Sequence, residues 1–321
     1  MRGADYVLRR AAFALLTVFF AVTLNFVIFR AAPGDVASAL RCRNCPIEFK
    51  EALRAEFGLD RPKIEQYGIY LKELLQGNMG RSFVSQQPVW NELRTALANT
   101  LPMLALGTAF SIVFGIAAGV LAAWRRGTFA EWSQVSTSLF FYAMPTQWLG
   151  LMLIIVFSGV LPVSGISDPF LEFSDPGAWT TFVDRMKHML LPSLTLGLVL
   201  YGEYALITRS ALLQTLGEDY VLTARAKGLS NRAIVFRHGL RNALLPITSL
   251  IALSVGYLVG GSILVEAVFS YPGIGLEVYE AIFERDFPVL QGAFLLLTLS
   301  VVLANFVADL VYLKLDPRIA Q

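Results

Sequence analysis

Few residues in this chain have the side chains and spacing that chemistry requires. Cys42 and Cys45 form a Cys-x-x-Cys pair, a pattern shared by disulfides, redox pairs and metal sites. A thioredoxin-type redox pair needs a βαβ context, which is absent here. Two cysteines without nearby histidines make a weak metal site. An oxidising exterior favours a disulfide, so we expect one between Cys42 and Cys45 if this segment lies outside the cell.

Nucleotide hydrolysis and metal catalysis are not predicted for this chain. None of its six lysines follows a glycine, so it lacks the GxxxxGK[ST] loop that cradles phosphates. Its two histidines, His188 and His238, fall on opposite sides of the membrane in the topology given below, which excludes a paired-histidine zinc enzyme. We therefore predict no catalytic residue, no metal site and no cofactor in this chain.

The composition indicates that most of the chain folds into apolar helices. Apolar residues make up 55% of the 321 positions and charged residues 16%, whereas an ordinary soluble domain has about 25% charged residues. The 26 basic and 24 acidic side chains leave a net charge of only +2, without the basic surplus of a nucleic-acid binder. Disordered chains and secreted disulfide scaffolds are also excluded. The composition predicts an all-α, polytopic membrane protein in contact with lipid.

A helix needs about 20 mostly apolar residues to cross the hydrocarbon core. Six runs are long enough, and we predict one span in each: 11–29, 95–124, 132–167, 188–208, 242–265 and 287–308. The third run is longer than one helix needs, and Pro162, Ser164 and Gly165 are expected to end its helix. The first run exceeds the ~7–15 residues of a signal sequence, which indicates an uncleaved helix.

Lys and Arg in short loops predict the orientation, because they concentrate on the cytoplasmic side. Basic residues occur at the N-terminus, after span two, between spans four and five, and after span six. If the six spans alternate in direction, all of these segments lie on one side of the membrane. The short loops on the opposite side are acidic. Both termini are therefore expected in the cytoplasm. The chain is predicted to begin with a cytoplasmic N-terminus (1–10) and a first span (11–29). An outer segment (30–94) follows, with helices near 47–57 and 64–76. The core (95–321) contains the other five spans and an inside loop (210–245).

The inside loop carries the most informative pattern. Residues 212–227 have apolar side chains at helical spacing, Gly228 suits a left-handed C-terminal cap, and Ser230 can cap a second helix. These features fit either a solvated, positive-inside loop or a short functional helix held against the membrane by two spans.

The sequence DYVLTARAKGL at 219–229, followed by RNALLP at 241–246, resembles the EAA loop of ABC-importer permeases. Its form is similar to that of the first permease subunit in the dipeptide, oligopeptide and nickel branch. Leu222 and Thr223 stand where other importers have Glu and Ala, a variant usual for this branch. Further strings resemble the family in order along the chain: APGD (32–35), FGLDRP (57–62), GNMGRS (77–82), LPSLTL (191–196), EAVFSYPGIG (266–275), RDFP (285–288) and LDPR (315–318).

The resemblance implies the type I ABC-importer permease fold with six transmembrane helices. In the family this loop is a coupling helix that docks into a cleft of an ATPase subunit, where ATP and Mg²⁺ are bound. The implied partners are two ATPase subunits (or one fused pair), a second homologous permease and an extracytoplasmic solute-binding protein, in a bacterial or archaeal inner membrane. The residues that match the loop and would couple to the ATPase are Glu218, Asp219, Tyr220, Thr223, Ala224, Arg225, Ala226, Lys227 and Gly228.

Other candidate residues lie in or near the spans. Gly256, Gly260 and Gly261 in span five, like Gly115 and Gly119 in span two, suit close helix packing or the pore. Asn25 is either a packing hydrogen bond or a peptide contact. Glu266, Tyr271 and Pro272 open the outer EAVFSYPGIG string and are candidates for an outer gate or for docking of the binding protein.

Three classes of function are weighed. The first is an ATP-driven importer permease for peptides, with nickel or other small solutes as alternatives. A self-sufficient secondary transporter or channel would show an internal repeat and midplane ionisable groups, and neither is evident. An integral membrane enzyme would need a catalytic cluster of His, Asp or Glu, which is also missing.

Overall fold

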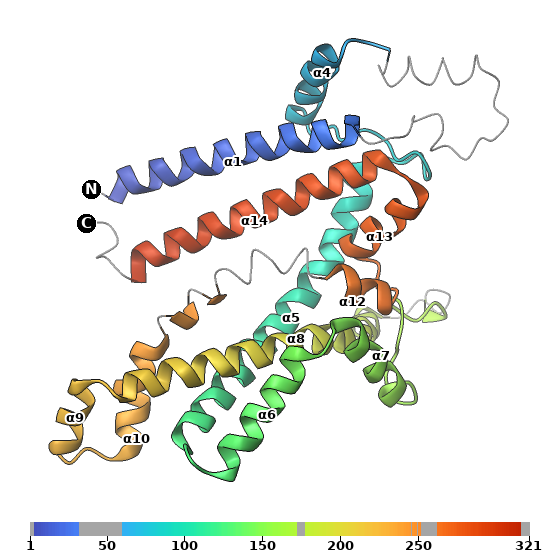
Figure 1. The fold of residues 1–321 in the computed structure, drawn as a ribbon. Coiled ribbons are helices and arrows are strands. Elements are labelled where there is room, and N and C mark those ends of the chain that lie inside the picture. The colour runs from blue at the N-terminus through green and yellow to red at the C-terminus, as the bar shows by residue number, and fades with distance from the viewer. Residues whose placement is uncertain are drawn as a thin grey trace. The chain divides into compact units, whose positions relative to one another are not determined.

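The structure is a computed structural model of the 321-residue chain. It describes residues 3–31, 60–171, 177–244, 246–248, 250–251 and 262–315. In this part of the chain the regular elements are helices (Figure 1), and β-type pairing is limited to an isolated bridge between Arg81 and Pro88. The expected all-α class is confirmed.

The principal helices are α1 (Gly3–Ala31), α4 (Lys63–Leu75), α5 (Val89–Trp124), α6 (Phe129–Ala143), α7 (Thr146–Phe157), α8 (Ala178–Leu216), α9 (Asp219–Ala226), α10 (Asn231–Ala233), the π-helix η2 (Ile234–Gly239), α12 (Ile263–Val268), α13 (Ile274–Glu284) and α14 (Phe287–Leu315). Among the described residues, four helices are long and apolar enough to cross a membrane, or five if α6 and α7 form one bent span. These helices correspond to predicted spans one to four and six. Half of the fifth, including Gly256, Gly260 and Gly261, lies outside the described residues, as do Cys42, Cys45 and the helix expected at 47–57.

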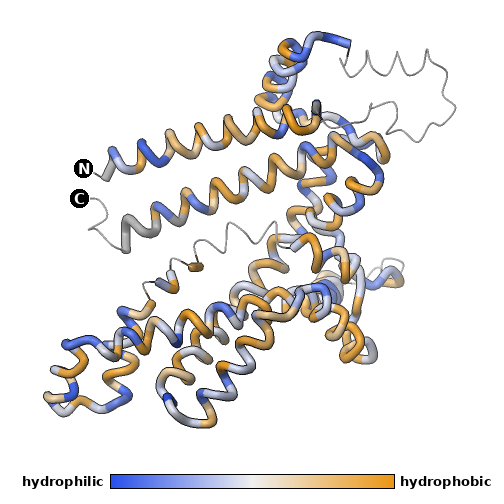
Figure 2. Tube along the Cα trace, viewed as in Figure 1, coloured by the Kyte–Doolittle hydropathy of each residue, from blue (hydrophilic) through white to orange (hydrophobic). Residues whose placement is uncertain are grey.

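The chain forms two compact units, one from residues 1–100 and 272–321 and the other from 101–271. In the first unit α1 and α14 lie side by side and run antiparallel (Figure 1). Figure 2 shows that the middle of each helix is predominantly apolar. Arg10 pairs with Asp309 at 3.2 Å near one end of the helix pair. Near the other end, Asn25 Nδ2 donates to the carbonyl oxygen of Gln291 at 2.9 Å.

A buried carboxylate organises the end of the first unit where α14 begins. Asp286 precedes α14, and its Oδ1 accepts the N–H of Val289, 3.4 Å away, as a helix cap does. Its Oδ2 accepts the Ser82 hydroxyl at 2.5 Å and the N–H of Val84 at 3.2 Å. The GNMGRS and RDFP strings therefore meet in space although about 200 residues separate them, because each supplies one side of this hydrogen-bonded site.

In the second unit, glycines on α5 allow close contact with α8. A Cβ atom added at Gly115 would lie 2.7 Å from the Cβ of Tyr204, and one added at Gly119 would lie 2.5 Å from the carbonyl oxygen of Ala205. Small residues let apolar helices approach to this distance, where backbone and side-chain atoms gain dispersion contacts. For Gly115 and Gly119 the structure thus supports packing within the chain.

The third predicted span is not one continuous helix, contrary to expectation. α6 ends at Ala143, α7 begins at Thr146, and the two helices are bent by 106°. Pro145 disfavours the helical conformation in the residue before it, and Met144 is accordingly extended, with φ −76° and ψ 129°. Pro162, which is predicted to end this helix, lies beyond the end of α7 at Phe157, because Pro145 interrupts the apolar run first.

The substitution Gly119→Val tests the α5–α8 contact. Because the contacted atoms belong partly to the α8 backbone, they cannot move without separating the helices, and overpacking of this kind costs about 2 kcal/mol. We expect a lower thermal unfolding midpoint of the purified protein in detergent. Gly159→Ala is the control, because a Cβ atom there meets nothing within 4 Å. Equal midpoints for both variants would contradict the packing role.

Candidate functional site

The inside loop begins in the last turns of α8 and continues through α9, α10 and η2. The helix predicted at 212–227 is interrupted, because α8 ends at Leu216 and α9 starts at Asp219. Gly217 is the C-cap of α8, and Glu218 is extended, with φ −73° and ψ 150°. Glycine has a low helix propensity, and its backbone leaves the helix at little cost. The break gives α9 a direction of its own at the tip of the long helix α8 (Figure 1).

Gly228 ends α9 in the conformation that the sequence predicts. Its φ is +76°, a left-handed value that other residues adopt only with strain. The N–H of Gly228 donates to the carbonyl oxygen of Arg225 at 2.9 Å, and the N–H of Leu229 donates to that of Ala224 at 3.3 Å. These two bonds form a Schellman motif. Ser230 then caps α10 by accepting the N–H of Ala233 at 3.3 Å, as expected.

A small apolar cluster holds α9 against the following helix. Val221 is fully buried, Ala224 is 6% exposed, and both pack with Ile234 of η2. Leu216 at the end of α8 contacts the same cluster. α9 therefore has one face fixed on the chain itself, and its position depends on α8 and η2.

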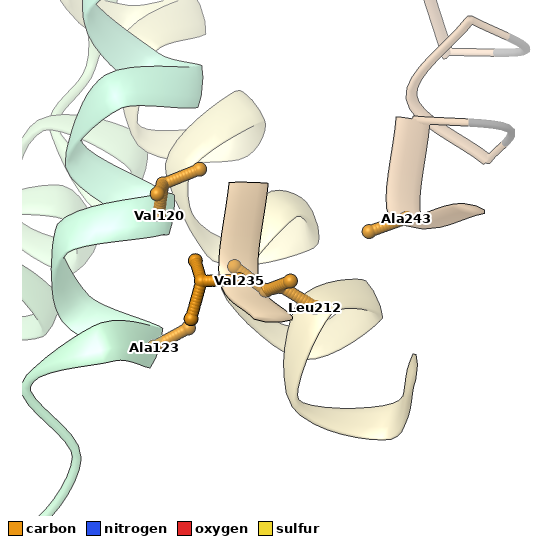
Figure 3. Packing of buried hydrophobic residues seen from close by; sticks show 5 residues of the cluster. All are labelled: Val120, Ala123, Leu212, Val235 and Ala243. Atoms are coloured by element: carbon orange, nitrogen blue, oxygen red, sulfur yellow. The ribbon is translucent and has the colours of Figure 1, made fainter. Parts of the chain in front are cut away.

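A second cluster fixes the base of the loop to the long helices. Val120 and Ala123 of α5 pack with Leu212 of α8 and Val235 of η2, as Figure 3 shows, and Ala243 belongs to the same cluster. Gly239 of η2 lies so close to α8 that an added Cβ would be 3.0 Å from both Leu212 and Leu216 side chains. Within the loop, Tyr220 of α9 accepts a hydrogen bond from Asn242 Nδ2 at 2.7 Å. The loop is thus tied to α5 and α8, and α9 is tied to the segment that follows η2.

The exposed face of α9 carries the predicted coupling residues, with one exception. Glu218, Asp219, Tyr220, Thr223, Arg225, Ala226, Lys227 and Gly228 are exposed. Leu222, which stands at a position that varies in the family, is also 55% exposed. Ala224 is the exception, because it lies in the cluster with Ile234. Ala224 shapes the loop from inside and offers no surface to a partner in this structure.

Two of the three candidates in the EAVFSYPGIG string, Glu266 and Tyr271, are buried. Glu266 is fully buried in α12 and Tyr271 is 2% exposed. The Tyr271 N–H donates to the carbonyl oxygen of Glu266 at 2.9 Å. Burial raises the pKa of Tyr271 to about 12, and the negative charge of Glu266 adds to this effect. Both side chains contribute to the interior of the second unit. Pro272 belongs to the first unit, where its carbonyl oxygen accepts a hydrogen bond from Asn99 at 2.8 Å.

Asn25 makes a hydrogen bond within the chain in this structure. It is buried, and its amide donates to the backbone of α14 as described above. An intramembrane amide of this kind stabilises helix association by about 1 kcal/mol.

A carboxylate that the sequence analysis did not single out lies in α13. Burial raises the pKa of Glu277 to about 7, and the nearby acidic groups Glu92, Glu280, Asp286 and Glu284 raise it further. Only the acidic character of this outer loop was visible in the sequence, because burial and the proximity of Glu92 depend on how α5 meets α13 within the first unit.

Comparison with known proteins identifies the family. Residues 111–321 match the family described as binding-protein-dependent transport system inner membrane component, and residues 4–104 match the N-terminal domain of such membrane components. The chain belongs to this family of transport permeases.

Relatives of this permease align along nearly its whole length. It is 39% identical to the di/tripeptide transport system permease protein of Pseudomonas aeruginosa and 38% identical to the dipeptide transport system permease protein of Escherichia coli. It is 35% identical to the glutathione transport system permease protein of Escherichia coli, and each alignment covers 98% of both chains. The resemblance stated from the loop and the other strings is confirmed, and the protein is a multi-pass inner-membrane component of a transport system.

Ala224 is buried and Ala226 is exposed. This difference allows a test of whether the apolar cluster holds α9 in place. In Ala224→Glu of this permease, a carboxylate enters the cluster of Val221 and Ile234, where an unpaired charge costs about 3 kcal/mol or more. We expect faster amide hydrogen exchange across 216–240. Ala226→Glu adds the same side chain at an exposed position and leaves the exchange rates unchanged. Similar exchange in the two variants would show that the cluster does not hold α9.

The raised pKa of Glu277 predicts a pH-dependent stability of the permease. Below its ordinary pKa of 4.5 the group is protonated in both folded and unfolded chains. Between pH 4.5 and about 7 the unfolded chain releases the proton while the folded chain keeps it, so this group lowers stability as pH rises through that window. Glu277→Gln removes the effect.

We therefore expect Glu277→Gln to raise the thermal midpoint in detergent at pH 8 but not at pH 4.5. Glu218→Gln, at an exposed position of the second unit, controls for the loss of one negative charge, because Glu218 is not among the groups that shift the pKa of Glu277. A midpoint gain for Glu277→Gln that is the same at both pH values would exclude this explanation.

Proposed function

We propose that this chain is one of two permease subunits of an ATP-driven importer of short peptides. In this proposal it forms half of the translocation pathway, and loop 210–245 transmits the energy of ATP hydrolysis from partner ATPases. ATP and Mg²⁺ bind in those partners. A second homologous permease and an extracytoplasmic solute-binding protein complete the system.

The exposed face of α9 is the observation that carries the proposal. A ligand or partner can shift a conformational equilibrium only through contacts that differ between the states. α9 supplies a surface for such contacts, while its other face is fixed to η2 and to the end of α8. A push on α9 therefore reaches helices long enough to cross the membrane. A solvated loop without such packing would absorb the displacement.

The substrate class rests on the relatives. Those named above transport di- and tripeptides, dipeptides or glutathione, which is itself a small peptide. We therefore favour short peptides over nickel or other small solutes. A self-sufficient secondary transporter is also disfavoured, because the family is defined by dependence on a binding protein.

The charge pattern supports a cytoplasmic location for this loop and for both termini. Arg225, Lys227 and Arg237 in the loop lie between predicted spans four and five, where basic residues retain a short loop on the cytoplasmic side. Segment 30–94 is then external, and core 95–321 contains the remaining spans. This sidedness places α9 where ATPases are found.

The proposal is tested in the complete complex reconstituted in proteoliposomes. Ala226→Glu places a charge on the exposed face of α9 without disturbing its cluster. We expect it to reduce dipeptide uptake and ATPase stimulation by the loaded binding protein at least tenfold, which corresponds to about 1.4 kcal/mol of docking free energy. The control is Gln87→Glu, which adds the same charge at an exposed position of the first unit. Undiminished coupling in Ala226→Glu, or a wild-type chain that purifies without any ATPase, would refute the proposal.

A further inference from the structure

An ion pair joins three parts of the second unit next to the proposed coupling loop. Glu131 lies in the first turn of α6, and Arg209 lies on α8, one turn before Leu212. One carboxylate oxygen of Glu131, Oε1, accepts hydrogen bonds from both Nε and Nη2 of Arg209, with Nε at 3.0 Å. The other oxygen, Oε2, accepts the N–H of Gly127 at 2.6 Å. The Glu131 side chain is 13% exposed and the Arg209 side chain is 29% exposed.

The turn that Glu131 holds is itself well defined. Gly127 has φ +78°, and the Thr128 hydroxyl donates to the carbonyl oxygen of Arg125 at 2.6 Å. α5 ends at Trp124, directly before this turn. A single carboxylate therefore connects the end of α5, the start of α6 and the side of α8.

Beyond the ion pair, α6 remains in contact with α8 over most of its length. Tyr201 donates to Gln134 Oε1 at 3.1 Å. Gly202 lies against Ser138 and Tyr142, where an added Cβ would be 2.3 Å from the Ser138 carbonyl oxygen. This contact zone ends where α6 meets the bend at Met144 and Pro145. α6 is thus held to α8 at both ends, and the chain changes direction immediately after the second contact.

We propose that Arg209 and Glu131 are positioning residues that make α6 move together with α8 when the coupling loop is displaced. This inference rests on the proposed function and names the route by which displacement of α9 reaches the bend between α6 and α7. Apolar packing alone lets a helix rotate or slide at modest cost. A guanidinium held by two bonds to one carboxylate oxygen fixes the relative rotation, because charge-assisted pairs are strong and directional.

The first test measures coupling in the complete complex in proteoliposomes, with dialanine as the transported peptide. Glu131→Gln and Arg209→Gln each remove one charge of the pair. We expect the number of peptides transported per ATP hydrolysed to fall at least fivefold in either variant. Arg209→Lys keeps the charge but loses the two-bond geometry, so its ratio is expected to lie between wild type and Arg209→Gln. Asp309→Asn is the matched control, because it breaks the Arg10–Asp309 pair of the first unit and should keep the wild-type ratio.

The second test follows the helices directly. In the complex with Cys42 and Cys45 replaced by serine, spin labels are placed at the exposed positions Trp132 on α6 and Ser210 on α8. Pulsed electron-spin spectroscopy should give one label distance that is the same with and without bound ATP. Glu131→Gln should broaden it or make it depend on ATP.

The outcomes separate this inference from the proposed function. A wild-type ratio of peptide to ATP in Glu131→Gln, or label distances unaffected by the substitution, would overturn the positioning role while the importer assignment stands. A wild-type complex that neither binds ATPases nor transports peptide would instead overturn the proposed function. A ratio reduced equally by Asp309→Asn would show a general effect of lost ion pairs and would also reject the inference.

Discussion

Hydrocarbon offers no water to hydrogen-bond a backbone N–H or C=O group, and this constraint determines much of the permease. Spanning segments must satisfy those groups internally, which makes them helices. Polar side chains near them need partners because an unpaired polar atom is costly there. The described part of the chain follows this rule at Asp286 and at the Arg209–Glu131 pair, each of which joins segments distant in sequence. The same bonds that meet the polar requirement therefore also position the helices.

The inside loop combines a fixed face with an available one. Val221 and Ala224 are buried against Ile234, while Leu222 and the charged residues around it are exposed. The Schellman motif at Gly228 and the contact of Gly239 with α8 restrict how the loop can bend. In the function that we propose, the loop transmits force, because displacement of its exposed face must move the residues packed beneath it. This construction connects membership of a transport-permease family with the proposed entry of energy from a neighbouring subunit.

Prediction from sequence succeeded where local physical chemistry decides the structure. The apolar runs at 11–29, 95–124, 188–208 and 287–308 became helices, because their length and composition admit no other membrane-spanning form. Gly228 and Ser230 became caps, because their conformational and hydrogen-bonding preferences are local. Two expectations failed for reasons that are also local but were overlooked. Pro145 ends α6 before Pro162 could do so, and Gly217 separates α8 from α9.

Composition, helix length and the loop strings are properties of the chain alone, and they are enough to predict the class of protein, the positions of most spans and the family. The burial of Ala224 and Glu266, the acidic surroundings of Glu277 and the pairing of Glu131 with Arg209 follow instead from the packing of the helices. Burial and long-range pairing depend on which helix faces approach one another. That approach is set by the sum of many weak contacts across the unit, and no single stretch of sequence encodes it.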